Sequence, residues 1–462
     1  MKKFFSSKLF RLIWSAGLAA LFYYVCPPCF SKTTLTWILS GLLIIVNIFP
    51  FFNNTKGVIH TLWFWKIQIF RVGVGGLFIF SGFIKSNDPL GFSYKLEEYF
   101  DVFVEAVKGG HNIESLGLFS RMSIHFFEFF HGQALILAIL LCVSEMILGF
   151  MLLVGYKRNL TLWLLLAQIV FFTFLTFYSA CYNKVTHCGC FGDFLKLKPW
   201  ESFWKDIVLM ISIAILFTGR DHINEIFTYM ITNSLVVLAL IASIVFPVYA
   251  YRNLPPLDFR PYAIGMDIKK NMETPPTYKP PVYETRFWYR NLQTNEIKEF
   301  DMKNYPWQDT LHWAHDSTLN ILVHDAIDPP KIVDFSINDL DGNPITDSIL
   351  NIKGYHFLLV CYDLNKTDDD ETLHAKMNDL YKLAASEKIP FLALTASDAK
   401  MIDNYKHAHQ ALYDFANVDG IVLKTMIRSN PGLILMNGST VVMNWHYHNF
   451  PTYSDVKQKY MK

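Results

Sequence analysis

Two pairs of closely spaced cysteines are the residues of this chain best suited to chemistry. Cys188 and Cys190 lie one residue apart, and Cys26 and Cys29 flank two prolines. A thiolate attacks a disulfide through a mixed-disulfide intermediate, so such pairs indicate thiol–disulfide exchange. A bridge across Cys-Gly-Cys closes a very small ring, and we expect the strain of that ring to make the bond more oxidising.

Other interpretations of these cysteines stay open. The two pairs are also compatible with static disulfides, with Cys181 as a third candidate partner. A metal site is the least favoured alternative, suggested by His187 and Cys181 close to the second pair, since zinc accepts such ligands. Of the seven cysteines, the remaining two, Cys142 and Cys361, fall inside apolar runs. We expect both to be core residues.

The elements that position the cysteine pairs are expected to be membrane helices. The chain has 462 residues, is 52% hydrophobic and only 18% charged, and has a mean hydropathy of +0.23. A helix needs about 20 apolar residues to cross a bilayer. Seven runs are candidates, at about 9–25, 35–52, 66–84, 134–153, 160–179, 206–218 and 233–250. The net charge of +1 offers no case for nucleic acid.

The distribution of Lys and Arg predicts the orientation of these spans. Basic residues precede the first span and occur between the second and third, the fourth and fifth, and the sixth and seventh. The positive-inside rule places those four segments, and therefore the N-terminus, in the cytoplasm. Both cysteine pairs and everything after Tyr251 then lie on the opposite face, where disulfides persist.

Ionisable residues in the predicted spans form a second group of candidates. Glu145 falls near the middle of the fourth span, and Arg71 in the third span is a candidate partner. Lys85 and Asp88 lie at the outer end of the third span. Charges in a bilayer are costly and often functional, so a proton relay or ligand site is one interpretation. An interhelical ion pair that fixes packing is the other.

The polar half of the chain predicts an α/β domain behind a linker. Residues 251–281 are rich in proline and read as an extended spacer, and 282–333 contain short alternating runs. In 334–462, strand patterns at 357–362 and 391–394 enclose a helical pattern at 371–387. One or two helices are expected over 398–416, followed by a hairpin around Asn437-Gly438. The expected domains are therefore 1–250, 251–333 and 334–462.

Two patches resemble the DoxX and MauE families of redox-associated bacterial membrane proteins. They are residues 80–91, which read FSGFIKSNDPLG, and residues 188–193, which read CGCFGD and are followed by Trp200 and Lys205-Asp206. The whole layout is similar to an uncharacterised DoxX-like family from Bacteroidota. The resemblance implies a bacterial inner-membrane protein, and MauE-like proteins are linked to disulfide handling during maturation of periplasmic enzymes.

The C-terminal half resembles the thioredoxin-like domains of the peroxiredoxin and TlpA type. Residues 334–343 fit their opening hairpin, and Asn430-Pro431 sits where such folds carry a cis-proline. Redox-active members place Cys-x-x-Cys after the first central strand, but residues 363–370 read DLNKTDDD. The resemblance therefore implies a degenerate, non-catalytic thioredoxin-like domain.

We thus expect an α-helical membrane bundle of about seven spans followed by an extracytoplasmic α/β thioredoxin-like domain. The favoured function is thiol–disulfide exchange on the periplasmic face, with the C-terminal domain docking a protein client. A quinone acceptor is suggested only by analogy with membrane enzymes of the DsbB and VKOR type. The alternative is a non-catalytic scaffold subunit of an envelope complex, in which the cysteines are structural.

Overall fold

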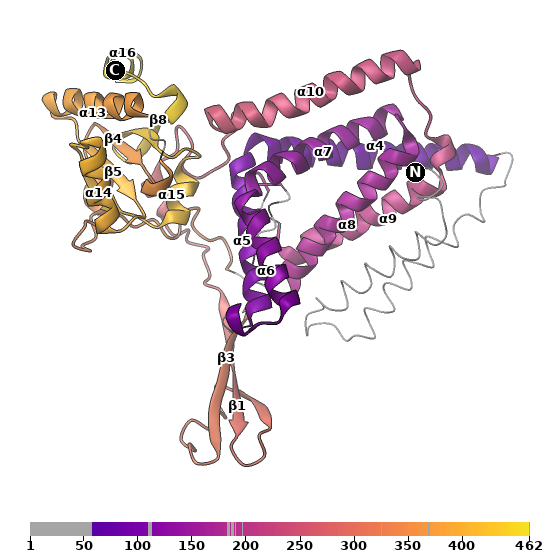
Figure 1. Cartoon of the computed structure of the whole chain (residues 1–462), viewed down its shortest axis with the longest axis horizontal. Coiled ribbons are helices and arrows are strands. Elements are labelled where there is room, and N and C mark those ends of the chain that lie inside the picture. The colour runs from indigo at the N-terminus through magenta and orange to yellow at the C-terminus, as the bar shows by residue number, and fades with distance from the viewer. Residues whose placement is uncertain are drawn as a thin grey trace. The chain divides into compact units, whose positions relative to one another are not determined.

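The computed structural model describes residues 58–109, 113–182, 185, 189, 191–195, 197–324, 326–367 and 370–461. The two predicted spans at about 9–25 and 35–52 lie outside these residues, as do all four cysteines of the two close pairs. The chain divides into two compact units, one that ends at Phe259 and one that begins at Arg260. The described part of the first unit is helical, and the second unit contains two sheets (Figure 1).

Seven helices make up the described part of the first unit and are labelled as in Figure 1. Their bounds are α4 (Val58–Asn87), α5 (Pro89–Lys108), α6 (Leu118–Gly132), α7 (Ala134–Val154), α8 (Arg158–Tyr182), α9 (Pro199–Thr218) and α10 (Tyr229–Asn253). Short 3₁₀ helices lie at Ile113–Ser115 and Arg220–His222. Apolar side chains of α4, α7, α8 and α9 form one buried core cluster, which includes Val74, Leu152, Leu165 and Ile213.

Four segments in the described part of the chain are long and apolar enough to cross a membrane: Trp63–Asn87, Ala134–Val154, Arg158–Tyr182 and Tyr229–Asn253. They coincide with the third, fourth, fifth and seventh predicted spans. The sixth predicted span falls within α9, which has 20 residues but carries Glu201, Lys205 and Asp206 in its first half. These charges distinguish α9 from the four candidate spans, although it packs against α8 in the same bundle.

Helices α5 and α6 occupy the long segment between the third and fourth predicted spans. A new helix begins directly after α4, because the Asp88 carboxylate accepts a hydrogen bond from Gly91 N at 2.9 Å and Pro89 occupies the first turn. Helix α6 leaves a row of large apolar side chains exposed: Leu118, Phe119, Met122, Phe126 and Phe129. Such a row suits contact with lipid.

Helices α4 and α7 approach each other closely because glycines lie at their contact. A Cβ added at Gly149 would lie 2.6 Å from the carbonyl oxygen of Gly75, and one at Gly82 would lie 2.9 Å from the backbone nitrogen of Met146. Small residues let helix backbones approach in a bilayer, where the hydrophobic effect does not drive helices together. This contact sets the register in which the last turns of α4 meet the middle of α7.

Gly149→Ala is expected to destabilise the helical unit by about 1–3 kcal/mol, because the added methyl meets backbone that has little room to move. Gly76→Ala is the matched control on α4, since nothing lies within 4 Å of a Cβ there. In a helix interior, Ala is favoured over Gly by up to about 1 kcal/mol. Unfolding of the purified variants in mixed micelles measures both effects. Equal stability of the two variants would contradict the close contact.

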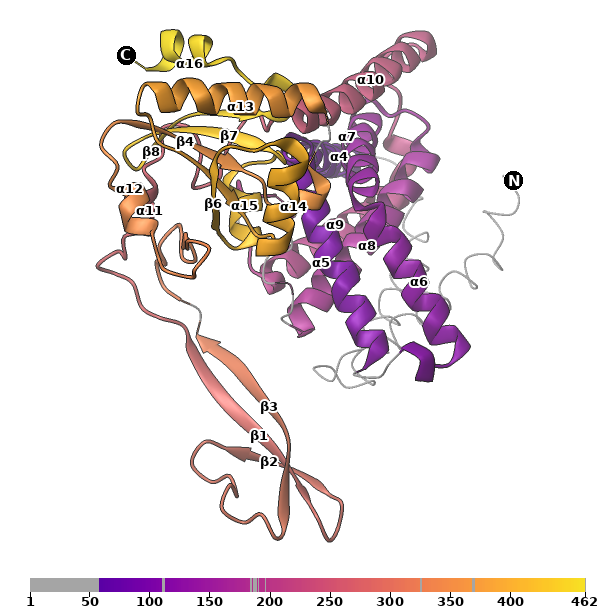
Figure 2. The ribbon, with the colours of Figure 1, turned by 60° about the vertical axis from the view of Figure 1, so that its left-hand side comes forward.

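The larger sheet of the second unit has five strands in the order β6-β5-β4-β7-β8. Strands β4 (Tyr355–Val360), β5 (Phe391–Thr395) and β6 (Asp414–Asn417) are parallel, whereas β7 (Gly432–Asn437) and β8 (Thr440–His446) are antiparallel. Helix α13 (Glu371–Ser386) connects β4 to β5 and packs near the C-terminal α16 (Tyr453–Tyr460), as Figure 2 shows. The predicted βαβ unit and hairpin are therefore present, and the Asn430-Pro431 peptide is cis.

One predicted boundary in this unit is wrong. We expect helices over 398–416, but α14 (Ala399–His409) ends before a strand, β6, begins at Asp414. Phe415 and Ala416 pair with β5 and are buried in the sheet. Four residues are too few for a period-2 pattern to be recognised, so tertiary pairing determines this strand rather than a local signal. A further helix, α15 (Gly420–Met426), follows it, capped by Asp419.

The predicted β-rich segment contains a separate three-stranded antiparallel sheet in the order β2-β1-β3. Its strands are β1 (Val282–Asn291), β2 (Ile297–Asp301) and β3 (Trp313–His324). Aromatic side chains gather on it, with Tyr289 close to the rings of Phe300, Tyr305 and His315. Two short helices, α11 (Ile268–Met272) and α12 (Thr346–Leu350), complete the unit.

Candidate functional site

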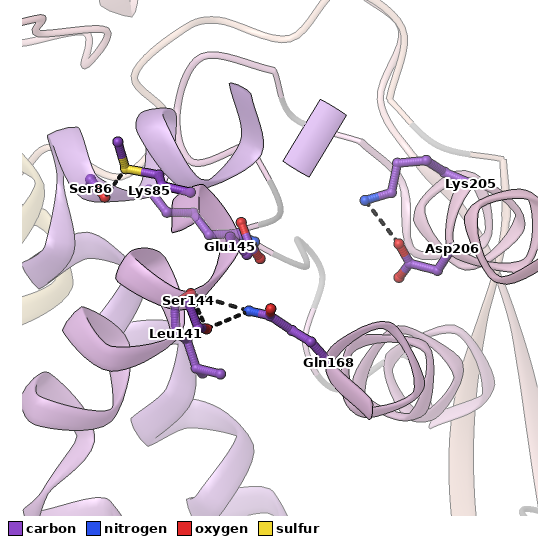
Figure 3. A network of polar contacts seen from close by, with 9 residues as sticks. Lys85, Ser86, Leu141, Ser144, Glu145, Gln168, Lys205 and Asp206 are labelled. Atoms are coloured by element: carbon purple, nitrogen blue, oxygen red, sulfur yellow. Dashed lines mark hydrogen bonds and ion pairs between the residues drawn. The ribbon is translucent and has the colours of Figure 1, made fainter. Parts of the chain in front are cut away.

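A buried ion pair joins α4 to α7 inside the helical unit. Lys85 Nζ lies 2.5 Å from Glu145 Oε1, and the two side chains are only 2% and 3% exposed. The Lys85 ammonium also lies 4.2 Å from the ring centroid of Phe172 and 5.3 Å from that of Phe92. Removing two charges from water is costly, so each depends on the other and on these aromatic faces. Figure 3 shows Lys85 and Glu145 side by side.

A second ion pair lies at the start of α9. Lys205 Nζ is 3.0 Å from Asp206 Oδ1, and the Asp206 side chain is 1% exposed while that of Lys205 is 24% exposed. Thr176 Oγ1 of α8 donates a hydrogen bond to the other carboxylate oxygen of Asp206, at 3.0 Å. The Lys205 ammonium lies 5.1 Å from the ring centroid of Phe191. This pair is less buried than the Lys85–Glu145 pair, since the Lys205 side chain is partly exposed.

The two ion pairs line one cavity. Its walls come from α4, α7, α8 and α9 and from Phe191. The cavity measures about 30 Å³, and a buried water needs at least roughly 10–15 Å³. The space therefore suits water and is too small for a drug-sized or quinone-sized ring. In Figure 3 the Lys205–Asp206 pair lies to the right of Glu145.

Among the described residues, no hydrogen-bond partner faces one of the two carboxylate oxygens at this cavity. Glu145 Oε1 faces Lys85, but Oε2 is buried and has no hydrogen-bond partner among the described residues. Nearby, Gln168 Nε2 of α8 donates to Ser144 Oγ at 2.8 Å and to Leu141 O at 3.2 Å, which holds α8 against α7. A buried carboxylate oxygen without a partner is costly, and a cavity water is its natural partner.

The CGCFGD motif meets this cavity through Phe191. Phe191 lines it, and a Cβ added at Gly192 would lie 3.8 Å from Ile84 of α4. A Cβ at Gly189 would lie 3.3 Å from Lys95 of α5. Both glycines have positive φ, 69° at Gly189 and 50° at Gly192, which favours glycine over other residues. Gly192 thus lies against the end of α4, and Gly189 against the first turns of α5.

The other two charged candidates, Arg71 and Asp88, do not line this cavity. The expectation that Arg71 approaches Glu145 is wrong, because Arg71 donates to the carbonyl oxygens of Leu152, Leu153 and Asn224 at 2.8–3.1 Å. Arg71 lies 14 residues before Lys85, about 21 Å along a straight helix. It caps the end of α7, and Asp88 caps α5.

The cysteines in the described part of the chain do not gather into a cluster of metal ligands. Cys142 is buried in α7 and Cys361 in the sheet core, and Cys181 is half-buried at the end of α8. Among the described residues, no group of three or more His, Cys, Asp or Glu side chains is placed to hold a metal ion. The four paired cysteines and His187 lie outside those residues, so the metal alternative for them stays open.

Lys205, Asp206 and Thr176 are not among the site residues predicted from the sequence. The signal was present, because Lys205-Asp206 is an adjacent pair of opposite charges at the start of an otherwise apolar run. The sequence does not show that these residues lie near Glu145, because Glu145 and Lys205 are 60 positions apart and come together only in the folded bundle.

The comparison with known families bears on this part of the chain. Residues 102–219 match the family model of the methylamine utilisation protein MauE. The match covers about a quarter of the chain and includes α7, α8, α9 and the CGCFGD motif, so Glu145 and Asp206 lie within the MauE-matching segment. Lys85 precedes it. Searches of curated proteins and of solved structures gave no significant match.

Proposed function

We propose that this protein carries out thiol–disulfide exchange at a membrane surface, with Cys188 and Cys190 as the working pair and Cys26 and Cys29 as the partner pair. It is a membrane protein by its apolar helices and its MauE-matching segment. In the exchange, a thiolate of a client attacks the Cys188–Cys190 disulfide, and a second client thiolate releases the protein as a dithiol.

One observation carries the proposal. The CGCFGD motif lies within the MauE-matching segment, and its Phe191 lines a cavity that also holds the buried Lys85–Glu145 pair and the partly exposed Lys205–Asp206 pair. Reactive cysteines sit in environments with nearby cations, which favour the thiolate over the thiol. Lys85 and Lys205 supply two cations at this cavity, each in an ion pair with a carboxylate, and Gly189 and Gly192 lie close to Lys95 and Ile84.

The proposed setting is the bacterial inner membrane, with the N-terminus in the cytoplasm and the second unit in the periplasm. The distribution of Lys and Arg supports this orientation. In this scheme, residues 1–250 form the membrane domain, 251–333 a linker with a small β-rich element, and 334–462 the domain that docks a client.

The docking role follows from the chemistry that the second unit lacks. Its strand order and its βαβ-hairpin sequence support a thioredoxin-like fold. Its one cysteine, Cys361, is fully buried, and desolvation raises the pKa of the thiol to about 12. A thiol with that pKa is almost entirely protonated at neutral pH and is a poor nucleophile. A domain without a reactive thiol can bind a client but cannot relay its electrons.

A second candidate function is equally compatible with a second unit whose one cysteine is unreactive. If the cysteine pairs are static bridges, the protein is a non-catalytic scaffold of an envelope complex and the second unit is a binding module. The buried Cys361 is compatible with both functions, so the redox behaviour of Cys188 and Cys190 distinguishes them.

A redox titration of the purified full-length protein, with mass-spectrometric mapping of every cysteine pair, tests the proposal. We expect a disulfide that contains Cys188 and opens between about −120 and −270 mV, the range of known exchange proteins. A bridge that resists reduction to below about −300 mV is typical of structural disulfides. That result would reject exchange and favour the scaffold.

A further inference from the structure

We propose that Glu145 is a proton-transfer site, which exchanges protons with the working thiols through water in the cavity between α4, α7, α8 and α9. This inference rests on the proposed exchange function and adds an acid–base residue to it. The carboxylate would accept the proton of an attacking thiol and return a proton to the departing thiolate.

The two carboxylate oxygens of Glu145 have different surroundings. Oε1 is occupied by Lys85 at 2.5 Å, whereas Oε2 is buried without a hydrogen-bond partner among the described residues. Glu145 is one of the residues that line the cavity, which has room for water. One oxygen is therefore anchored, and the other has lone pairs available to a water that can carry a proton.

The charges that face Glu145 come from several helices. Lys85 approaches from α4, Lys205 and Asp206 line the same cavity from α9, and Cys142 lies one turn away on α7. Helix α8 contributes neutral polar groups, Gln168 and Thr176, near the cavity. The charges of the two cations and the two carboxylates at the cavity sum to zero. Adding or removing one proton therefore changes the net charge of the site by one unit only.

The cavity is linked to the cysteine motif by direct packing. Phe191 lines the cavity and stands next to Cys190 in the sequence. Phe92 contacts the Lys85 ammonium and also lies 3.9 Å from a Cβ built at Gly189. Phe191 therefore lines the cavity directly, and Gly189 lies next to Phe92, whose ring faces the Lys85 ammonium.

The exchange reaction requires a group that accepts and returns protons near the cysteine pair. A client dithiol and the Cys188–Cys190 disulfide become a client disulfide and two protein thiols. Two S–H bonds break in the client and two form in the protein, so no external oxidant and no net proton are required. Each attack needs a base and each departing thiolate needs an acid, and one carboxylate that cycles between its two forms serves both steps.

The test measures exchange of the full-length protein in lipid nanodiscs, with dithiothreitol as the dithiol probe and quenched samples read by mass spectrometry. Glu145→Gln is expected to slow opening of the Cys188–Cys190 bridge by about 10²-fold or more at neutral pH. The equilibrium constant with dithiothreitol should not change, because a proton carrier alters rates only. The exposed Arg158–Asp221 pair, at the other end of α8, supplies the control variant Arg158→Met with an unchanged rate.

The pH profile separates proton transfer from a purely structural role. In Glu145→Gln, the attacking thiol must lose its proton to bulk solvent. The rate of bridge opening should therefore rise about tenfold per pH unit below the pKa of the probe thiol. The wild-type rate should rise less steeply. Formate or azide should restore part of the rate in Glu145→Ala, where the lost side chain leaves room for a small acid.

A double variant covers the case in which Glu145→Gln alone does not fold. Lys85→Met/Glu145→Gln removes both charges, and the same rate loss is expected from it. A double variant that folds and reacts at the wild-type rate, with the wild-type pH profile, would overturn the inference and leave the exchange function standing. A wild-type bridge that reacts no faster than oxidised glutathione under the same conditions would instead reject the exchange function itself.

Discussion

Replacing Cys188 or Cys190 with Ser is expected to abolish thiol–disulfide exchange, because either change removes the bridge that a client thiolate attacks. Each single variant retains one thiol of the pair, so we also expect it to form mixed disulfides that no neighbouring thiol can resolve. Non-reducing gels and mass spectrometry of the full-length protein after incubation with a reduced dithiol peptide would detect the loss of exchange. Incubation with oxidised glutathione would detect the mixed disulfide, because the remaining thiol attacks the glutathione disulfide and releases one reduced glutathione.

The matched control for this prediction is Cys361→Ser. With a pKa of about 12, roughly one Cys361 thiol in 10⁵ is ionised at pH 7, and the side chain is fully buried. Exchange should therefore proceed at the wild-type rate. If Cys361→Ser lost exchange as completely as Cys188→Ser, the second unit would take part in the chemistry and the docking role proposed for it would fail.

Lys85→Met is expected to destabilise the helical unit by about 3–5 kcal/mol, because it leaves the buried Glu145 carboxylate without its cation. Replacing both partners, in Lys85→Met/Glu145→Leu, should recover most of that loss, since two apolar side chains of similar volume need no partner. Unfolding in mixed micelles gives the free energies, and the double-mutant cycle gives the coupling between the two residues.

The exposed ion pair between Arg158 and Asp221 is the reference for this change in the free energy of unfolding. It joins the start of α8 to the 3₁₀ helix after α9, and its side chains are 35% and 63% exposed. Surface pairs of this kind contribute about 0–1 kcal/mol, so Arg158→Met should have little effect. A Lys85→Met variant no less stable than Arg158→Met would mean that bulk solvent screens the Lys85–Glu145 pair and that the pair is not buried in solution.

Local patterns in the sequence were sufficient for the individual elements. The apolar runs of α4, α7, α8 and α10 identify candidate spans, because every backbone polar group in a bilayer must be satisfied within a helix. The alternating and apolar runs of the C-terminal half likewise predict β4, α13, β5 and the β7–β8 hairpin. These signals depend on residues close in the chain, so they need no knowledge of the fold.

The partners of the buried charges could not be read in this way. Glu145 was recognised as an unusual charge in a span, but Arg71 and Lys85 were both possible partners from sequence. The close glycine contacts of α4 with α7 bring Lys85 to Glu145 and place Arg71 at the end of α7. Helix register depends on a few short contacts across two helices, and those contacts involve residues more than 60 positions apart.

The sequence by itself therefore determined that the chain has apolar helices, an α/β domain and clustered cysteines near apolar runs. Only the tertiary structure decided that Glu145, Lys85, Lys205 and Asp206 line one cavity, and that Asp414–Asn417 is a strand. The physical reason is the same in both cases. A helix or strand is specified by periodicity along the chain, whereas a cavity and an edge strand arise from packing between segments that the sequence keeps far apart.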